Sequence, residues 1–100
     1  MRVHLTEQAR TELFEIGEWI ERDNPARAKS FVEELFDACM RLGDMPNAFA
    51  LLRTRPQSGI RMRTYGNYLI FYKVSDRVNV LHIVHGSRNY HAVLFPDESQ

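Results

Sequence analysis

The sequence predicts a single α+β domain over residues 1–100, with the element order β-α-α-β-β-β. Two amphipathic helical patterns occupy residues 7–42, and the short Asp-Asn-Pro segment between them predicts an antiparallel helix hairpin. Three strand patterns follow between residues 59 and 85, separated by short turns. We therefore expect an N-terminal strand and the helix hairpin to pack on a mainly antiparallel, twisted sheet.

The composition is that of an ordinary globular domain. A chain of 100 residues buries roughly two-thirds of its unfolded surface, which is enough for a two-layer core. The single cysteine, Cys39, rules out an intramolecular disulfide and suits a reducing compartment. No apolar run approaches the ~20 residues of a membrane span, and the N-terminus lacks the apolar segment of a signal peptide. We expect a cytoplasmic protein with no membrane partner.

The first half of the chain carries the strand and the hairpin. Residues 2–6 alternate between apolar and polar side chains, and Thr6 is a good N-cap for the helix that follows. Apolar residues then recur at helical spacing from Ala9 to Ile20. The solvent-facing side of this helix is expected to carry Glu12, Glu15, Glu18 and Glu21.

The second helix has clear signals at both ends. Asn24 is a natural N-cap and Pro25 a natural first helical residue, whereas Gly43 is placed to end the helix. Cys39 falls within the apolar stripe, so we interpret it as a small core residue.

The second half predicts the sheet. Residues 59–64 alternate, so Ile60 and Met62 face one side and Arg61 and Arg63 the other. Residues 68–74 are apolar on both faces, as is typical of a central strand, and residues 78–85 form the last strand. Residues 86–95 are compatible with a short C-terminal helix or an extended tail.

The two halves differ in charge. Residues 1–50 carry six basic and ten acidic side chains, and residues 51–100 carry seven basic and three acidic ones, so the halves have net charges of −4 and +4. Such asymmetry indicates an anionic partner for the second half, either nucleic acid or an acidic peptide. The alternative is that the acidic residues only solvate the helices and the basic ones the sheet.

Three segments carry a resemblance to a known family: NPARAKSFVEELFDACMRLGDMP at 24–46, GIRMRTYGNYLIFYKV at 59–74 and VNVLHIVHGSRNYHAVL at 78–94. With the order of the elements, they resemble the ParE/RelE superfamily of toxins from bacterial type II toxin–antitoxin modules. The second helix and the final strand running into HGSR at 85–88 resemble the ParE branch in particular.

The resemblance implies two quite different activities on one fold. ParE-like toxins inhibit DNA gyrase by protein–protein binding and arrest growth, whereas RelE-like toxins are ribosome-dependent endoribonucleases that cut mRNA. In both cases the expected partner is a small antitoxin, ParD-like or related, which forms a hetero-oligomer with the toxin. Operator DNA is then bound only through the antitoxin. A third interpretation is a non-toxic module that still binds antitoxin.

The residues expected of a nuclease are only partly present. The resemblance matches Arg61, Arg63 and Arg88 to basic positions of RelE-like nucleases. The middle-strand arginine and the tail tyrosine of those enzymes fall at Leu69 and Leu94, which are aliphatic. RNA cleavage needs groups that move protons, and a guanidinium group is poorly suited to that task.

Neighbouring residues keep the nuclease alternative open. Tyr68 or Tyr90 could replace the missing tyrosine, and His85, close to Arg88, is the histidine best placed for acid–base work. His82 is three residues from His85, so on a strand the two point to opposite faces and cannot share one site. We interpret His82 as a half-buried histidine with a satisfied ring.

The favoured interpretation is a ParE-like gyrase inhibitor rather than an enzyme, with no cofactor and no metal. Arg61 and Arg63 are then a docking pair on the open face of the sheet. The other residues expected to contact the target or the antitoxin are Trp19, Arg88, Tyr90 and Phe95.

Overall fold

The computed structural model describes residues 1–98 and has the predicted order of elements. These are β1 (Val3–Leu5), α1 (Glu7–Glu21), α2 (Pro25–Met40), β2 (Arg61–Tyr65), β3 (Tyr68–Val74), β4 (Val78–His85) and α3 (Tyr90–Leu94). Short 3-10 turns occupy Arg41–Gly43, Pro56–Ser58 and Pro96–Glu98. The C-terminal segment is therefore a short helix, which is one of the two forms expected for it.

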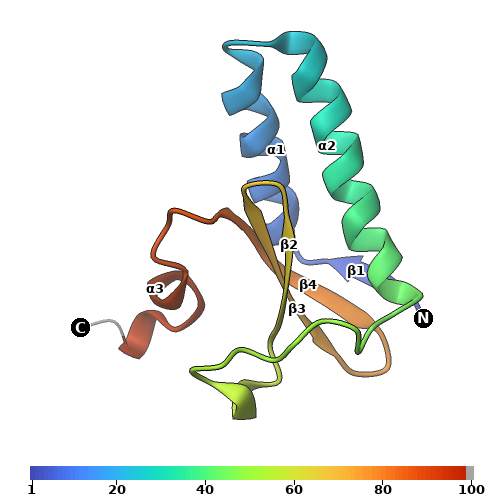
Figure 1. Ribbon diagram of the computed structural model, residues 1–100, viewed down its shortest axis with the longest axis vertical. Coiled ribbons are helices and arrows are strands. Elements are labelled where there is room, and N and C mark those ends of the chain that lie inside the picture. Colours follow the sequence, from blue (N-terminus) through green and yellow to red (C-terminus); the bar gives the residue numbers. More distant parts are fainter. Residues whose placement is uncertain (99–100) are drawn as a thin grey trace.

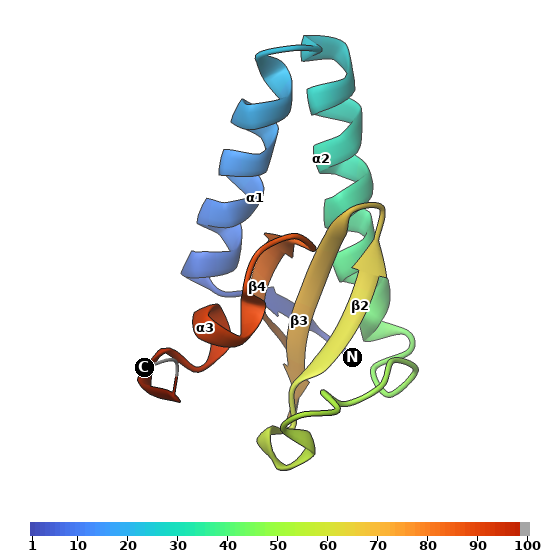
Figure 2. The same cartoon turned by 60° about the vertical axis from the view of Figure 1, so that its left-hand side comes forward.

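The four strands form one sheet in the order β1-β4-β3-β2. β1 pairs in parallel with β4, and the other two pairs are antiparallel. β3 lies inside the sheet, as its apolar pattern predicts. Figures 1 and 2 show the α1–α2 hairpin rising from one side of the sheet, with the turn between the helices and the β3–β4 turn toward opposite ends of the molecule.

Two hydrophobic cores lie on opposite faces of the sheet. The larger joins the helix hairpin to the sheet through side chains such as Leu35, Ile70 and Tyr72. The smaller lies under the 51–60 loop and α3, and Phe71 is its fully buried centre. Because successive residues of β3 point to opposite faces, this one strand contributes to both cores.

The helix starts follow the predicted caps. The Thr6 hydroxyl accepts the backbone N–H of Ala9 at 3.2 Å and lies 2.9 Å from the Val80 carbonyl oxygen, to which it donates. The Asn24 side chain accepts the backbone N–H of Arg27 at 3.1 Å. Both caps are confirmed, and Thr6 also fixes the start of α1 to β4.

Glu12 differs from its expected place. It is only 8% exposed, whereas the helical pattern assigned it to the solvent side with the other glutamates. One carboxylate oxygen accepts the backbone N–H of Ile83 at 2.8 Å, and the other accepts from Nδ1 of His82 at 3.0 Å. Because β1 ends at Leu5, β4 has no strand partner on its β1 side at Ile83, and the Glu12 carboxylate accepts the backbone N–H there instead.

Opposing effects act on this carboxylate. Burial raises the pKa of Glu12, but the hydrogen bonds from His82, Ile83 and Gln8 lower it by more, so the net shift is downward. Glu12 therefore stays ionised, and His82 is the satisfied, half-buried histidine that its position predicted.

Cys39 is fully buried in the larger core, which confirms its interpretation as a core residue. Burial raises the pKa of its thiol to about 12, against a smaller opposing effect of Arg63. We expect the native protein to react with a thiol reagent at pH 8 far more slowly than the urea-unfolded chain, because the thiolate is the reactive form. Fast labelling of the folded protein would contradict this burial.

Candidate functional site

A groove lies between α1 and the end of β4, and we call it the α1–β4 groove. Its volume is about 560 Å³. The groove brings together three residues that the sequence singled out, Trp19, His85 and Arg88. Glu15, Ile16 and Tyr68 also line it.

The groove exists because β1 is short. β1 pairs with β4 only from Val78 to Val80, so on that side the rest of β4 lies beside α1 instead of beside a strand. Ile16, Ile83 and Val84 give the groove apolar surface. Its charged lining consists of two acidic side chains, Glu12 and Glu15, and one arginine, Arg88. Trp19 is 66% exposed, with the Arg22 guanidinium 5.2 Å from the centre of its ring.

His85 is held by its neighbours. Its Nδ1 accepts the backbone N–H of Ser87 at 3.1 Å and lies 2.8 Å from the Ser87 hydroxyl oxygen. Its ring meets that of Tyr68 edge-on, with 5.2 Å between the ring centres. Within residues 1–98, no carboxylate is hydrogen-bonded to His85, so its ring lacks the acidic partner that often orients a general base.

Arg61 and Arg63 do not lie on an open face, so that expectation was wrong. Their strand partners in β3 are Tyr72 and Ile70, which belong to the helix-side core. Arg61 donates to the Phe49 carbonyl at 2.6 Å. Arg63 donates to the Ala38 carbonyl at 2.8 Å, where α2 ends. Carbonyls in the last turn of a helix lack intrahelical partners, and Arg63 supplies one.

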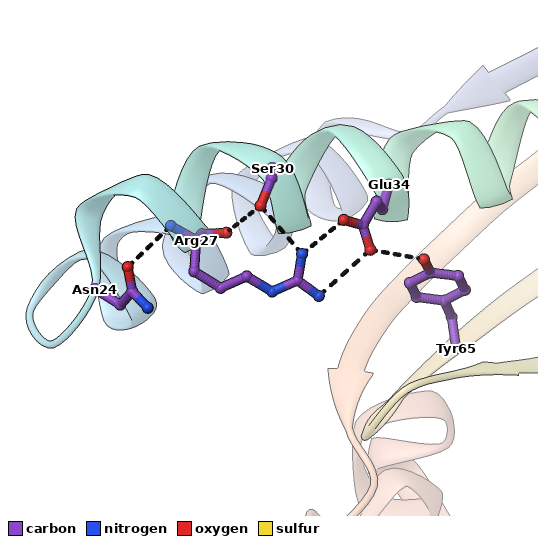
Figure 3. A network of polar contacts seen from close by, with 5 residues as sticks. All are labelled: Asn24, Arg27, Ser30, Glu34 and Tyr65. Atoms are coloured by element: carbon purple, nitrogen blue, oxygen red, sulfur yellow. Dashed lines mark hydrogen bonds and ion pairs between the residues drawn. The ribbon is translucent and has the colours of Figure 1, made fainter.

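A second link joins α2 to the same edge strand (Figure 3). The Tyr65 hydroxyl donates to one oxygen of Glu34 at 2.9 Å, and Arg27 donates to the other at 2.6 Å. The hydrogen bond to Glu34 raises the pKa of Tyr65. β2 is therefore fastened to the second helix at both Arg63 and Tyr65, which gives these residues a structural role.

Tyr90 and Phe95 lie away from the groove. The ring of Tyr90 packs on Phe71 with 5.1 Å between ring centres, and Phe95 packs against His91 at the same distance. Arg55 forms an ion pair with Glu98 and places its guanidinium 5.9 Å from the Phe95 ring. Both aromatic residues belong to the smaller core and hold α3 and its continuation on the sheet.

Residues 1–98 contain neither a cluster of metal-ligating side chains nor a membrane-spanning helix. No three histidine, cysteine, aspartate or glutamate side chains gather there as a metal site would require. None of the helices in this part of the chain has the length and apolar character needed to cross a membrane.

The sequence matches a known protein family. The family model, which describes the ParE toxin of the type II toxin–antitoxin system parDE, matches residues 3–90 of this chain. This chain is a member of the ParE toxin family. No curated protein sequence matches this ParE-family toxin.

Two solved structures share the fold. One is a chain of the chromosomal ParDE system from P. aeruginosa, with a TM-score of 0.74 and 20% identity over 85% of this chain and 95% of that one. The other comes from the RelBE2 toxin–antitoxin complex of Mycobacterium tuberculosis, with a TM-score of 0.58 and 25% identity over 84% and 95%. The α+β fold of the ParE/RelE toxins is therefore confirmed for this ParE-family toxin.

Glu15 and Tyr68 line the groove but were not among the contact residues expected from the sequence. Glu15 looked like any other solvent-facing glutamate of its helix. Tyr68 was considered only as a substitute catalytic tyrosine, although it begins the central strand and contacts His85. Neither carries a local signal, because the groove depends on where β1 ends.

Replacing Arg63 of this ParE-family toxin by alanine is expected to lower the free energy of unfolding by about 1–2 kcal/mol. The change removes the hydrogen bond to Ala38 and the contact with Phe49, whose ring centre lies 5.1 Å from the guanidinium carbon. Urea unfolding measures the effect, with Arg53→Ala, an exposed arginine of the 51–60 loop, as the matched control. Equal stability of the two variants would contradict the structural role.

Proposed function

We propose that this ParE-family toxin inhibits DNA gyrase through protein–protein contact in the α1–β4 groove. One observation carries the proposal. The two positions at which RelE-like nucleases have an arginine and a tyrosine are Leu69 and Leu94, and both pack in the smaller core. Aliphatic side chains there neither stabilise charge on a phosphate nor transfer a proton.

The remaining candidates for proton transfer support the same view. Arg61 and Arg63 donate to backbone carbonyls. Burial raises the pKa of Tyr68, so the phenolate that would act as a base is scarcer than in water. Tyr90 is packed on Phe71.

The α1–β4 groove has the make-up of a protein-binding site. Energetically important residues of protein interfaces are enriched in tryptophan and arginine, here Trp19 and Arg88. The apolar side chains that line the groove supply surface that a partner can cover. The charges of Glu15 and Arg88 can fix the orientation of that partner.

A cognate antitoxin is the second partner. The family model is that of a toxin from a type II toxin–antitoxin system, and the two similar structures belong to ParDE and RelBE2 systems. We expect this antitoxin to form a hetero-oligomer with the chain and to prevent gyrase binding.

The test compares two reactions with one protein preparation. Purified chain is added to gyrase with relaxed plasmid and ATP, and in parallel to programmed ribosomes with mRNA. We expect supercoiling to stop and linear DNA to accumulate while the mRNA stays intact. Cut mRNA with unaffected supercoiling would instead support the nuclease, and His85 and Tyr68 would be the first residues to change.

The groove is tested by the double variant Trp19→Ala/Arg88→Ala. Loss of two strong interface contacts is expected to raise the concentration for half-maximal gyrase inhibition about 30- to 100-fold. The control, Phe14→Ala/Arg53→Ala, likewise removes one aromatic side chain and one arginine, from exposed positions outside the groove. Equal inhibition by the two double variants would exclude the groove as the gyrase contact.

A further inference from the structure

A row of polar side chains crosses three strands near the β3–β4 turn. His4 of β1 is paired with Asn79 of β4, and Asn79 is paired with Lys73 of β3. Neighbouring strands lie about 4.8 Å apart, so the row spans roughly 10 Å. The neighbours of Asn79 and Lys73, namely Val78, Val80 and Tyr72, are in the helix-side core, so the row lies on the face opposite the helices.

Arg77, in the β3–β4 turn, is fixed to the middle of this row. Its Nε donates to the side-chain oxygen of Asn79 at 2.9 Å, and the Asn79 amide nitrogen lies 3.4 Å from the Ser75 hydroxyl. The two terminal nitrogens of the Arg77 guanidinium have no hydrogen bond to any residue between 1 and 98. Asn79 thus holds the guanidinium group of Arg77 through its Nε, and the two terminal nitrogens of that group stay available as donors.

Lys73 completes the set of available cations. Its ammonium group has no ion pair within residues 1–98. Its side chain runs past Gly59, where an added Cβ would lie 3.7 Å from the lysine Cε. His4, Lys73, Arg77 and Asn79, which we call the basic row, share a hollow of about 540 Å³ whose lining contains no acidic residue.

The first helix, α1, carries charge of the opposite sign to the basic row. α1 carries five glutamates against one arginine. The helix hairpin turn and the β3–β4 turn lie toward opposite ends of the molecule (Figures 1 and 2). α1 runs from the sheet to the hairpin turn, so its last glutamates, Glu18 and Glu21, lie toward the end of the molecule away from the basic row and would repel a polyanion there.

We propose that the basic row binds the phosphate backbone of duplex DNA. Lysine, arginine and asparagine are among the side chains that contact DNA phosphates, and Arg77 has two adjacent donors for one phosphate. No phenylalanine, tyrosine or tryptophan lines the hollow, so it lacks the large rings on which the unstacked bases of a single strand would stack. An acidic peptide is disfavoured because Val74 and Leu81 are the only large apolar side chains that line the hollow, and stable peptide binding usually relies on larger buried anchors.

This contact would be direct and independent of sequence, in addition to any operator binding through an antitoxin. It is separate from the gyrase proposal, because the basic row and the α1–β4 groove share no residue. The two proposals can therefore fail independently.

The test measures binding of a fluorescent duplex of about 25 bp by anisotropy, starting at about 50 mM salt, where phosphate contacts are strong. We expect the full chain to bind the duplex with an affinity that falls steeply with salt. The variant Lys73→Ala/Arg77→Ala should bind at least tenfold more weakly. The slope of log K against log salt should fall by about 1.8, which is the loss of two phosphate contacts.

The matched control is Arg22→Ala/Lys29→Ala, which removes the same net charge from exposed positions of the helix hairpin. It should bind DNA like the unchanged protein. Circular dichroism melting checks that both variants fold, and the charge-preserving variant Lys73→Arg/Arg77→Lys should retain binding.

Four results would overturn the proposal. The first is no duplex binding at low salt, and the second is equal weakening by the control variant, which would reveal an effect of net charge only. The third is tighter binding to a single strand of the same length. The fourth is binding of a polyglutamate peptide that depends on Lys73 and Arg77 while duplex binding does not.

Discussion

Replacing Glu12 by alanine is expected to lower the free energy of unfolding by about 3 kcal/mol, because it leaves the backbone N–H of Ile83 buried without an acceptor. His82 loses its partner in the same change. For a domain of this size the melting temperature should fall by about 10–20 °C. Urea unfolding followed by circular dichroism gives the free energy directly.

The matched control is Glu15→Ala, three residues along the same helix and exposed. Its effect on stability should stay within about 0.5 kcal/mol, as is usual for surface positions. Equal loss of stability in the two variants would show that the hydrogen bonds of Glu12 to Ile83 and His82 do not stabilise the fold.

The free energy of unfolding at acidic pH provides a further check on the role of Glu12. Its pKa is lower in the folded protein than the ordinary value of 4.5, so its stabilising contribution is present above about pH 4.5 and is lost as the pH falls through the folded-state pKa. Glu12→Gln cannot ionise, so the stability gap between the two proteins should narrow below pH 4.5. A gap that stayed constant down to the acid transition would contradict the lowered pKa.

Replacing Phe71 by alanine is expected to destabilise the protein by about 3–5 kcal/mol, since it leaves a cavity in the smaller core. Phe71 is 0% exposed and packs against Tyr90 of α3. A loss of this size is a large part of the free energy of unfolding of a typical small domain. Hydrogen exchange should show α3 losing protection before the helix hairpin, because the hairpin belongs to the other core.

Phe14→Ala is the matched control for this change. Phe14 is 67% exposed, so the same truncation there should cost less than about 0.5 kcal/mol. A loss in α1 and α2 as large as that in α3 after Phe71→Ala would show that the two faces of the sheet unfold as one unit.

Local signals were enough for most of the fold. Thr6 and Asn24 cap their helices in the predicted way because capping depends only on a side chain and the next backbone N–H groups. Residues 68–74 form an inner strand because both of their faces are apolar and must be covered. Whether residues 86–95 form a helix or a tail depends on the surface of Phe71, which is distant in sequence.

The errors arose where one element meets the end of another. The alternation of polar and apolar residues in β2 places Arg61 and Arg63 on one face of the strand and Met62 on the other. It does not indicate which of the two faces the helices cover. The arginines lie on the helix side because their donors reach carbonyls at Ala38 and Phe49. Glu12 is buried for a similar reason. β1 ends before it reaches the level of Ile83 in β4, so the backbone N–H of Ile83 needs another acceptor, which Glu12 supplies.

The parallel pairing of β1 with β4 has a consequence for synthesis of the chain. Val3 pairs with Val78, so the first strand has no partner until the last strand leaves the ribosome. At 5–20 residues per second, that wait is about 4–15 s. Ile83, Val84 and His85 of β4 line the α1–β4 groove, so a nascent chain lacks the groove during this time. A partner that needs the groove can therefore bind only after β4 has been made.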